Sequence, residues 1–327
     1  MLAYVLRRLA TMGPLLVGIT FLAFLVIELA PGDFFSTLEM DPSISPEMVR
    51  EMKEAFGYGD PLVVRYVRWL SRVVQGDFGV SLAYRVPVAE LVGPRLFNTF
   101  LLSFSSMVFT WSLAIPIGIL VALWPNSAWD RLLSFLAFFG MSIPNFFLAF
   151  LLMYFALQTG WFPVGGSTSL DYDLLSPAQK ILDRIHHLVL PTIVLGTSGM
   201  AGLMRLMRAN VLELLQSDFV RTARAKGLPE RVVILKHLLR NALNPFVTLA
   251  GYELGTLLGG SALVEAVMNL QGLGTLMLDA VRSLDQYLVM ASVLMGSALL
   301  LVGNLLADLL LTVVDPRIDF SRLEAVK

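Results

Sequence analysis

The longest strongly basic segment lies between Ser217 and Pro245, in a stretch that reads SDFVRTARAKGLPERVVILKHLLRNALNP. From Met204 to Pro245 the chain has eight basic and three acidic residues, whereas its formal net charge is −1. Long apolar runs flank this basic stretch on both sides. Such a segment fits either docking on a partner protein or contact with anionic lipid headgroups. The residues alone leave both interpretations open.

Capping residues in the basic stretch predict two short helices. Ser217 can accept a hydrogen bond from the free amides of a helix start, and Asp218 suits the positive end of the helix dipole. Gly227 is a natural left-handed end for that helix, and Pro229 begins the next one. The sequence therefore predicts an elbow that turns at these two residues. Held rigidly to transmembrane helices, such an elbow could transmit a push.

Two polar residues in apolar surroundings are candidates for a translocation path. An ionisable residue such as Glu253 costs roughly 2.5–3.5 kcal/mol at the centre of a span and is a functional hypothesis by default. We expect it either to line a central path or to make a buried hydrogen bond to a neighbouring helix. Asn145 follows Pro144, so it is expected to satisfy backbone groups that a kink leaves free.

The sequence offers no set of residues for catalysis or metal binding. His186 and His187 are adjacent and have no third ligand at a suitable spacing, so we expect solvated loop histidines. The chain has no cysteine and no Gly-x4-Gly-Lys-Ser/Thr phosphate loop, so neither a disulfide nor an ATP site of its own is expected. The basic stretch also lacks the interleaved aromatic residues of a nucleic-acid site.

The elements that position these residues are predicted to be transmembrane helices. Mean hydropathy is +0.73, with 56% hydrophobic and 15% charged residues, whereas about 25% are charged in soluble domains. The apolar residues gather in runs of about twenty, the length that crosses a hydrocarbon core of roughly 30 Å. The first run is too long for a signal-peptide core, so we interpret it as a retained helix. Six spans are predicted, at 9–30, 98–123, 132–158, 188–204, 243–264 and 289–314.

The least apolar part of the chain, 31–93, is predicted to form a small cap. A helix should start at Ser45 and Pro46 and stop at Gly57, and PLVVRYVRWLSRVV has a second helical pattern. The loops also predict the orientation in the membrane. Basic residues precede the first span (Arg7 and Arg8), follow the second span (Arg131) and fill the basic stretch. With six spans all of them fall on one side of the membrane, which is expected to be the cytoplasm. Both termini would then be cytoplasmic and the cap extracytoplasmic.

The segments RTARAKGL and RNALNP, at 221–228 and 240–245, resemble the cytoplasmic signature loop of binding-protein-dependent ABC importer permeases of the dipeptide, oligopeptide and nickel type. The general family pattern is Glu-Ala-Ala, three further residues and then Gly. This chain has Arg221-Thr222-Ala223 and Gly227, so the second Ala and the Gly match. The Arg-Thr-Ala version is similar to that of the peptide branch.

The resemblance extends over nearly the whole chain. Further segments that fit the branch are ELAPGD from Glu28, DPLVVRYVRWL from Asp60, GDFGVSL from Gly76, GWFPVGG from Gly160, HLVLPTIVLG from His187 and DPRID from Asp315. The chain departs from the family after the fifth span, where Met268 and Gln271 replace a Phe and a Pro. The exact substrate, whether a dipeptide, an oligopeptide, nickel or an oligosaccharide, therefore stays open.

By this resemblance the elbow is a coupling helix that inserts into a groove of an ATPase subunit. The residues implied in coupling are Ser217, Asp218, Phe219, Arg221, Thr222, Ala223, Arg224, Ala225, Lys226 and Gly227. The small side chains Ala223 and Ala225 would let the backbone of a partner come close. Further implied partners are a sister permease, two ABC ATPase subunits that bind ATP and Mg, and an extracytoplasmic solute-binding protein.

The expected fold is an all-α polytopic membrane protein of the type I ABC importer permease class, in a bacterial or archaeal cytoplasmic membrane. Its expected parts are a first helix at 1–30, an extracytoplasmic segment at 31–93, a permease core at 94–314 with the coupling loop at about 205–242, and a cytoplasmic tail at 315–327. Such a chain forms half of a translocation pathway without an enzymatic site of its own. The alternative is a self-contained channel or ion-driven secondary transporter whose basic loop binds only lipid, although no clear repeat between the halves supports it.

Overall fold

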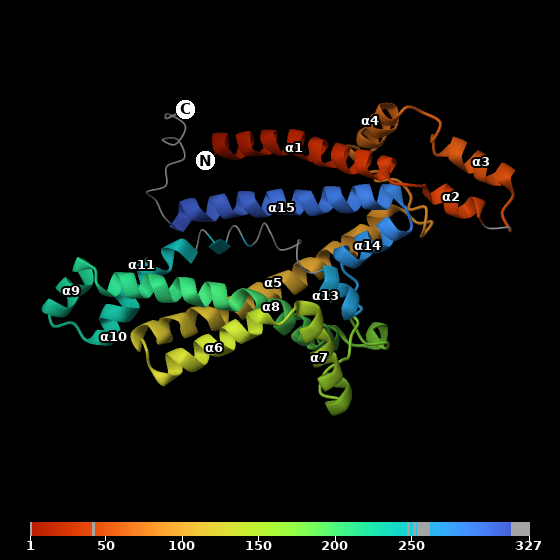
Figure 1. Ribbon diagram of the computed structural model, residues 1–327. Helices are drawn as coiled ribbons and strands as arrows, with labels where there is room; N and C mark the ends of the chain where they lie inside the picture. The colour runs from red at the N-terminus through yellow and green to blue at the C-terminus, as the bar shows by residue number, and fades with distance from the viewer. Residues whose placement is uncertain (1, 41–42, 247–248, 251–252, 254–261, 315–327) are drawn as a thin grey trace. The chain divides into compact units, whose positions relative to one another are not determined.

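The computed structural model describes residues 2–40, 43–246, 249–250, 253 and 262–314 (Figure 1). Within these residues every regular element is a helix, apart from an isolated antiparallel bridge between Val80 and Pro87. The expectation of a helical chain is therefore confirmed for the described part.

Four helices are long and apolar enough to cross a membrane, and a bent pair of shorter helices would make a fifth span. The four are α1 (Leu2–Leu29), α5 (Val88–Leu123), α8 (Pro177–Leu215) and α15 (Gln286–Val314). At 1.5 Å of rise per residue each exceeds the roughly 30 Å of a hydrocarbon core. Most of the expected span 243–264 lies outside the described residues, so its existence stays a prediction.

The third expected span is not one helix. It consists of α6 (Ala128–Ser142) and α7 (Asn145–Thr159), which meet at an angle of 101°. Pro144 has no backbone N–H and forces the residue before it out of the helical region, and Ile143 accordingly has φ −82° and ψ 124°. The sequence predicted a kink at this proline but not a break of this size.

The fourth expected span is longer than predicted at both ends. A capping box between Ser176 and Gln179 starts α8, and the helix continues through Pro191 to Leu215. His186 and His187 therefore lie on a helix rather than in a loop, which corrects the sequence-based expectation. The beginning of the predicted cytoplasmic loop is likewise helical, because α8 includes Arg205 and Arg208.

The chain divides into two compact units, and the first comprises Met1–Thr99 and Gln271–Leu301. Besides α1 and the N-terminal parts of α5 and α15 it contains α2 (Phe34–Glu39), α3 (Pro46–Ala55), α4 (Leu62–Val73) and α14 (Leu273–Arg282). Buried side chains from α1, α4 and α15 form one core, with Phe24, Tyr66, Trp69 and Met290. Another core holds Phe35, Val49 and Leu82.

The predicted start and stop of the helix in segment 31–93 are confirmed. The Ser45 hydroxyl accepts a hydrogen bond from the Met48 N–H (3.2 Å), and Pro46 is the first residue of α3. Gly57 follows the end of this helix with φ +70°, a conformation that favours glycine. The second helical pattern is present as α4.

The second unit comprises Phe100–Leu270 and Val302–Lys327. It holds α6, α7, α8 and a run of short elements that follows α8: α9 (Asp218–Ala225), α10 (Glu230–Val232), a π-helical turn (Val233–Leu238), α11 (Leu239–Ala242) and α13 (Ala262–Val267). In Figure 1, α9 and α10 lie beyond the C-terminal end of α8, the end that is predicted to face the cytoplasm. The basic stretch is therefore a compact helical elbow attached to the longest helix of this unit.

Candidate functional site

The elbow turns at Gly227, as the sequence predicts. This residue has φ +72° and follows the last residues of α9. Its N–H donates to the Arg224 carbonyl (2.9 Å), and the next N–H, of Leu228, donates to the Ala223 carbonyl (3.4 Å). This pair of bonds is a Schellman motif, which requires a left-handed residue at the turn. The predicted helical cap is therefore confirmed.

Ser217 does not cap α9 in the predicted way. Its hydroxyl donates to the Leu214 carbonyl (2.5 Å), which belongs to the last turn of α8, and no amide of α9 donates to this side chain. The last carbonyls of α8 have no partner within that helix, and one of them accepts the hydroxyl proton of Ser217, whose side chain then does not cap α9. The backbone carbonyl of Ser217 still accepts a bond from the Arg221 N–H (3.2 Å), so the residue joins the two helices.

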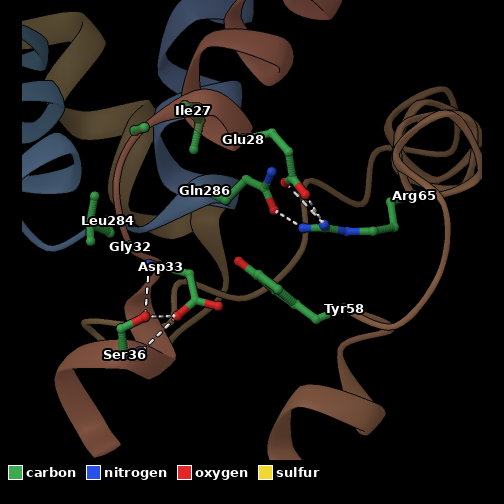
Figure 2. Close-up of a pocket in the computed structure, with 10 residues that line it drawn as sticks. Ile27, Glu28, Gly32, Asp33, Ser36, Tyr58, Arg65, Leu284 and Gln286 are labelled. Carbon is green, nitrogen blue, oxygen red and sulfur yellow. Dashed lines mark hydrogen bonds and ion pairs between the residues drawn. The ribbon is translucent and has the colours of Figure 1, made fainter. Parts of the chain in front are cut away.

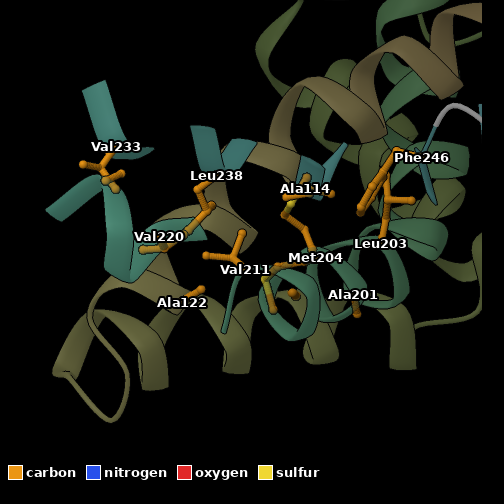
Figure 3. Close-up of a cluster of buried hydrophobic side chains, with 14 residues drawn as sticks. Ala114, Ala122, Ala201, Leu203, Met204, Val211, Val220, Val233, Leu238 and Phe246 are labelled. Carbon is orange, nitrogen blue, oxygen red and sulfur yellow. The ribbon is translucent and has the colours of Figure 1, made fainter. Parts of the chain in front are cut away.

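The inner face of the elbow belongs to the hydrophobic core of the second unit (Figure 3). Val220 and Ala223 on α9 are buried. They share a cluster with Val211 of α8 and with two residues of the second arm of the elbow, the helical segment that follows Pro229: Val233 and Leu238. The small side chain of Ala223 thus fits the elbow against its own bundle. This corrects the prediction that Ala223 lets a partner backbone come close, whereas Ala225 is exposed.

The outer face of the elbow is basic and partly apolar. Its exposed residues are Asp218, Phe219, Arg221, Thr222, Arg224, Ala225, Lys226, Gly227 and Leu228. A surface with cationic side chains around exposed Phe219 and Leu228 combines electrostatic attraction with apolar area that a partner can bury. The sequence-predicted coupling residues therefore separate into this outer face and an inner pair, Ser217 and Ala223.

An ion pair that the sequence did not suggest joins the two arms of the elbow. The Arg224 guanidinium contacts Glu230 through Nη2 to Oε1 (2.5 Å) and Nε to Oε2 (3.2 Å). The hydrogen bond from Arg224 holds the pKa of the Glu230 carboxyl below its usual value. The spacing of six residues is not a helical one, so only the turn itself brings the pair together.

A second unexpected ion pair joins α8, the helix that precedes the elbow, to the start of α6. Arg208 on α8 donates from Nη2 to Oδ2 of Asp130, at the start of α6 (3.0 Å). The Asp130 side chain is 9% exposed, and it also accepts bonds from the Asn126 N–H (2.9 Å) and the Ser134 hydroxyl (3.3 Å). These contacts attach the α5–α6 turn to α8.

The two candidate path residues lie in different surroundings. Glu253 accepts a hydrogen bond from the Trp111 indole N–H of α5 (Nε1 to Oε2, 2.5 Å), which is the inter-helix bond that the sequence left open as one of two readings. Asn145 is half-buried at the first position of α7, directly after the 101° bend. That they line a path stays a prediction.

The histidines join α8 to the loop before it. His187 is buried, and its Nδ1 lies 2.9 Å from the Asp183 carbonyl oxygen and 3.5 Å from the Asp183 carboxylate. His186 Nε2 lies 2.9 Å from the Trp161 carbonyl, and the Ser169 N–H and hydroxyl both donate to Asp183. Among the residues that the structure describes, no group of three or more His, Cys, Asp or Glu side chains could hold a metal ion.

The first unit contains a polar cavity of about 330 Å³ around Arg65 (Figure 2). Arg65 Nη1 donates to both carboxylate oxygens of Glu28 (2.9 and 3.0 Å), and Nη2 donates to Oε1 of Gln286 (2.8 Å). The Tyr58 ring covers the guanidinium at 4.1 Å. The ELAPGD and DPLVVRYVRWL segments therefore meet here, where a guanidinium that is 7% exposed connects α1, α4 and α15.

Comparison with known proteins agrees with this architecture. The family described as "Binding-protein-dependent transport system inner membrane component" matches residues 114–320, and the N-terminal membrane component of the same systems matches residues 1–92.

Relatives match the chain from end to end. The chain is 44% identical over 322 residues to the oligopeptide transport system permease protein AppB of Bacillus subtilis, which covers 98% of this chain and 100% of the relative. It is 36% identical over 339 residues to the dipeptide transport system permease protein DppB of Escherichia coli, and 37% identical over 322 residues to the glutathione transport system permease protein GsiC of Salmonella paratyphi A. Each alignment covers 98% of this chain and 100% of the relative. The chain therefore belongs to the inner membrane components of binding-protein-dependent transport systems, as an ABC importer permease of the dipeptide and oligopeptide branch that crosses the cytoplasmic membrane several times.

Proposed function

We propose that this chain forms half of the translocation pathway of an ATP-driven importer for peptides and receives the work of ATP hydrolysis through its elbow. The observation that carries the proposal is the end-to-end similarity to permeases named for oligopeptide, dipeptide and glutathione transport. A self-contained channel or secondary transporter, the alternative from sequence, has no such relative in its favour. Nickel or an oligosaccharide would be the related solutes if peptides are not carried.

The outer face of the elbow is the proposed contact with an ATPase subunit. Phe219, Arg221, Arg224 and Lys226 would bind it, with Gly227 fixing the turn. Closure of two ATPase subunits around ATP and magnesium would push the elbow. The inner face of the elbow is part of the core of the second unit, and a close-packed core transmits displacement. The push would therefore reach α8 and α5.

The wider assembly follows from the same proposal. Six spans with both termini in the cytoplasm, a type I fold and an extracytoplasmic cap at 31–93 would place the elbow beside the ATPases and the cap beside a solute-binding protein. A sister permease would complete the path. If the chain has six spans, Arg7, Arg8, Arg131 and the elbow would all fall on one side, and the preference of basic loops for the cytoplasm supports this orientation.

Glu253 and Asn145 are proposed to face the path. The Glu253 carboxylate would offer a counter-charge to a peptide amine when the Trp111 bond opens. Asn145 lies at the break between α6 and α7, where two helices of 15 residues each are too short to cross the bilayer alone. Broken helices of this kind are tolerated where they are buried in protein or line a water-filled cavity.

Uptake by reconstituted vesicles tests the proposal. The chain would be purified with its sister permease and ATPases, and uptake of radiolabelled tri-alanine would be measured with the solute-binding protein outside. We expect uptake that needs both ATP and the binding protein and that unlabelled peptides inhibit. Uptake by the chain alone, driven by an ion gradient, would instead establish the alternative.

A further inference from the structure

The ion pair between Asp130 and Arg208 joins α8 to the α5–α6 turn at the start of α6. Asp130 is the buried partner, and its Oδ2 accepts from both the Arg208 guanidinium (3.0 Å) and the Asn126 N–H (2.9 Å). Its own N–H donates to the Ser127 hydroxyl (3.1 Å), which caps α6. One carboxylate therefore fixes the turn and the beginning of α6 against a single position on α8.

The apolar packing around this pair is continuous with the elbow. Met204, Met207 and Val211 of α8 belong to the same buried cluster as Ala122 at the end of α5 and Val220 of α9 (Figure 3). The α5 and α8 backbones also approach closely, since a Cβ added to Gly118 would lie 2.7 Å from the Met204 carbonyl oxygen. The elbow and the α5–α6 turn thus share one core.

Apolar contacts alone do not fix how these helices slide along one another, because the hydrophobic effect is non-directional. An ion pair with hydrogen bonds of fixed direction does fix this register.

We propose that Asp130 and Arg208 are positioning residues that make the elbow, the adjoining half of α8 and the start of α6 move as one body. A displacement of the elbow then reaches α6 and, through the bend at Pro144, α7 with Asn145 at its start. The inference rests on the proposed function, because it needs a partner that pushes the elbow. It assigns to the α5–α6 turn a part in coupling that the sequence did not suggest.

The first test separates positioning from folding. In the double variant Asp130→Asn with Arg208→Met, both charges are gone, so no uncompensated charge is left behind, which is what makes breaking one half of a buried pair strongly destabilising. We expect normal amounts of assembled complex, but peptide imported per ATP hydrolysed should fall roughly tenfold, the scale of a coupling free energy between two sites. The matched control neutralises two exposed carboxylates of the same unit, Asp171→Asn with Asp173→Asn, and should leave this ratio unchanged. A double variant that imports as many peptides per ATP as the unsubstituted complex would overturn the proposal.

The second test does not depend on transport. Because the chain has no cysteine, spin labels can be placed at Leu132→Cys on α6 and Leu235→Cys in the second arm, both exposed. The distance between the labels should be the same with and without ATP in the assembled complex, and it should change with ATP once Asp130 and Arg208 are replaced. A distance that already changes with ATP in the otherwise unsubstituted complex would contradict movement as one body. This distance measurement stands even if the elbow proves not to be the ATPase contact, which the uptake assay decides separately.

Discussion

Replacing Gly227 tests whether the shape of the elbow matters for coupling. The residue has φ +72°, and a Cβ added there would meet no atom within 4 Å. A substitution therefore causes no clash, and its cost comes only from placing an L-residue in the left-handed region. That cost is roughly 1–2 kcal/mol for ordinary residues, smaller for Asn and larger for β-branched side chains.

The series Gly227→Asn, Gly227→Ala and Gly227→Val should therefore reduce coupling in that order. A strain of one to two kcal/mol lowers the population of the native turn, relative to a locally opened one, by a factor of about 5–30. We expect the ratio of peptide imported to ATP hydrolysed in vesicles to be nearly normal for Asn and to fall by up to that factor for Val. Membrane insertion and assembly should stay intact, because the core contacts of Val220 and Val233 are unchanged.

Gly160 provides a matched control in the same unit. It ends α7 with φ +66° and also has open space around an added Cβ. The same three substitutions carry the same local strain there but lie far along the chain from the elbow. Equal coupling in the Val and Asn variants of Gly227, or an equal loss in the Gly160 series, would refute the argument that the turn transmits force.

Three further outcomes follow from the structure. Gly118→Ala should destabilise the complex relative to Gly202→Ala by about 1–3 kcal/mol, measured as detergent unfolding, because the first Cβ meets a backbone oxygen at 2.7 Å and the second meets nothing within 4 Å. Glu28→Gln should cost about 3–5 kcal/mol or prevent accumulation, since it leaves the Arg65 side chain, which is 7% exposed, without its carboxylate partner, whereas Arg50→Gln, at an arginine that is 83% exposed, should not. Because the pKa of the Glu230 carboxyl is lowered in the folded state, its ion pair with Arg224 should still be present at pH 4.5, the ordinary carboxyl pKa, and be lost only as pH falls through the lower folded-state pKa, which the mobility of a spin label on the elbow would report.

Local signals in the sequence predicted the elbow well. Gly227 and Pro229 act within a few residues of themselves, so the turn and the start of the second arm follow from backbone preferences alone. Ser217 was wrong as a cap of α9 because two helix ends compete for one hydroxyl, and the choice depends on how α8 ends. The same dependence on neighbours made Ala223 an inward residue.

The ion pairs around Asp130 and Arg65 could not be predicted, because their partners are distant in sequence. Asp130 and Arg208 come from different helices, and Glu28, Arg65 and Gln286 come from three. Only packing decides these pairings, although the segments that hold Glu28 and Arg65 were already notable for their resemblance to the family.

The extents of the third and fourth spans differed from prediction for opposite reasons. Hydropathy marks the apolar part of a helix but not its ends, so α8 continued past the apolar run into Arg205 and Arg208. Pro144, by contrast, interrupted an apolar run that looked continuous, because backbone geometry acts independently of hydropathy. For the same reason the sequence did not predict that Asn145 would begin a separate helix, α7.

The central claim is that the outer face of α9 binds an ATPase subunit, and site-directed cross-linking tests it most directly. The chain has no cysteine, so a photoactivatable maleimide can be attached to Ala225→Cys on the exposed face or to Ala223→Cys on the buried face of the same helix. In the assembled complex we predict an adduct with the ATPase from position 225 and none from position 223. A label at position 225 that reacts only with lipid, or not at all, would contradict the account.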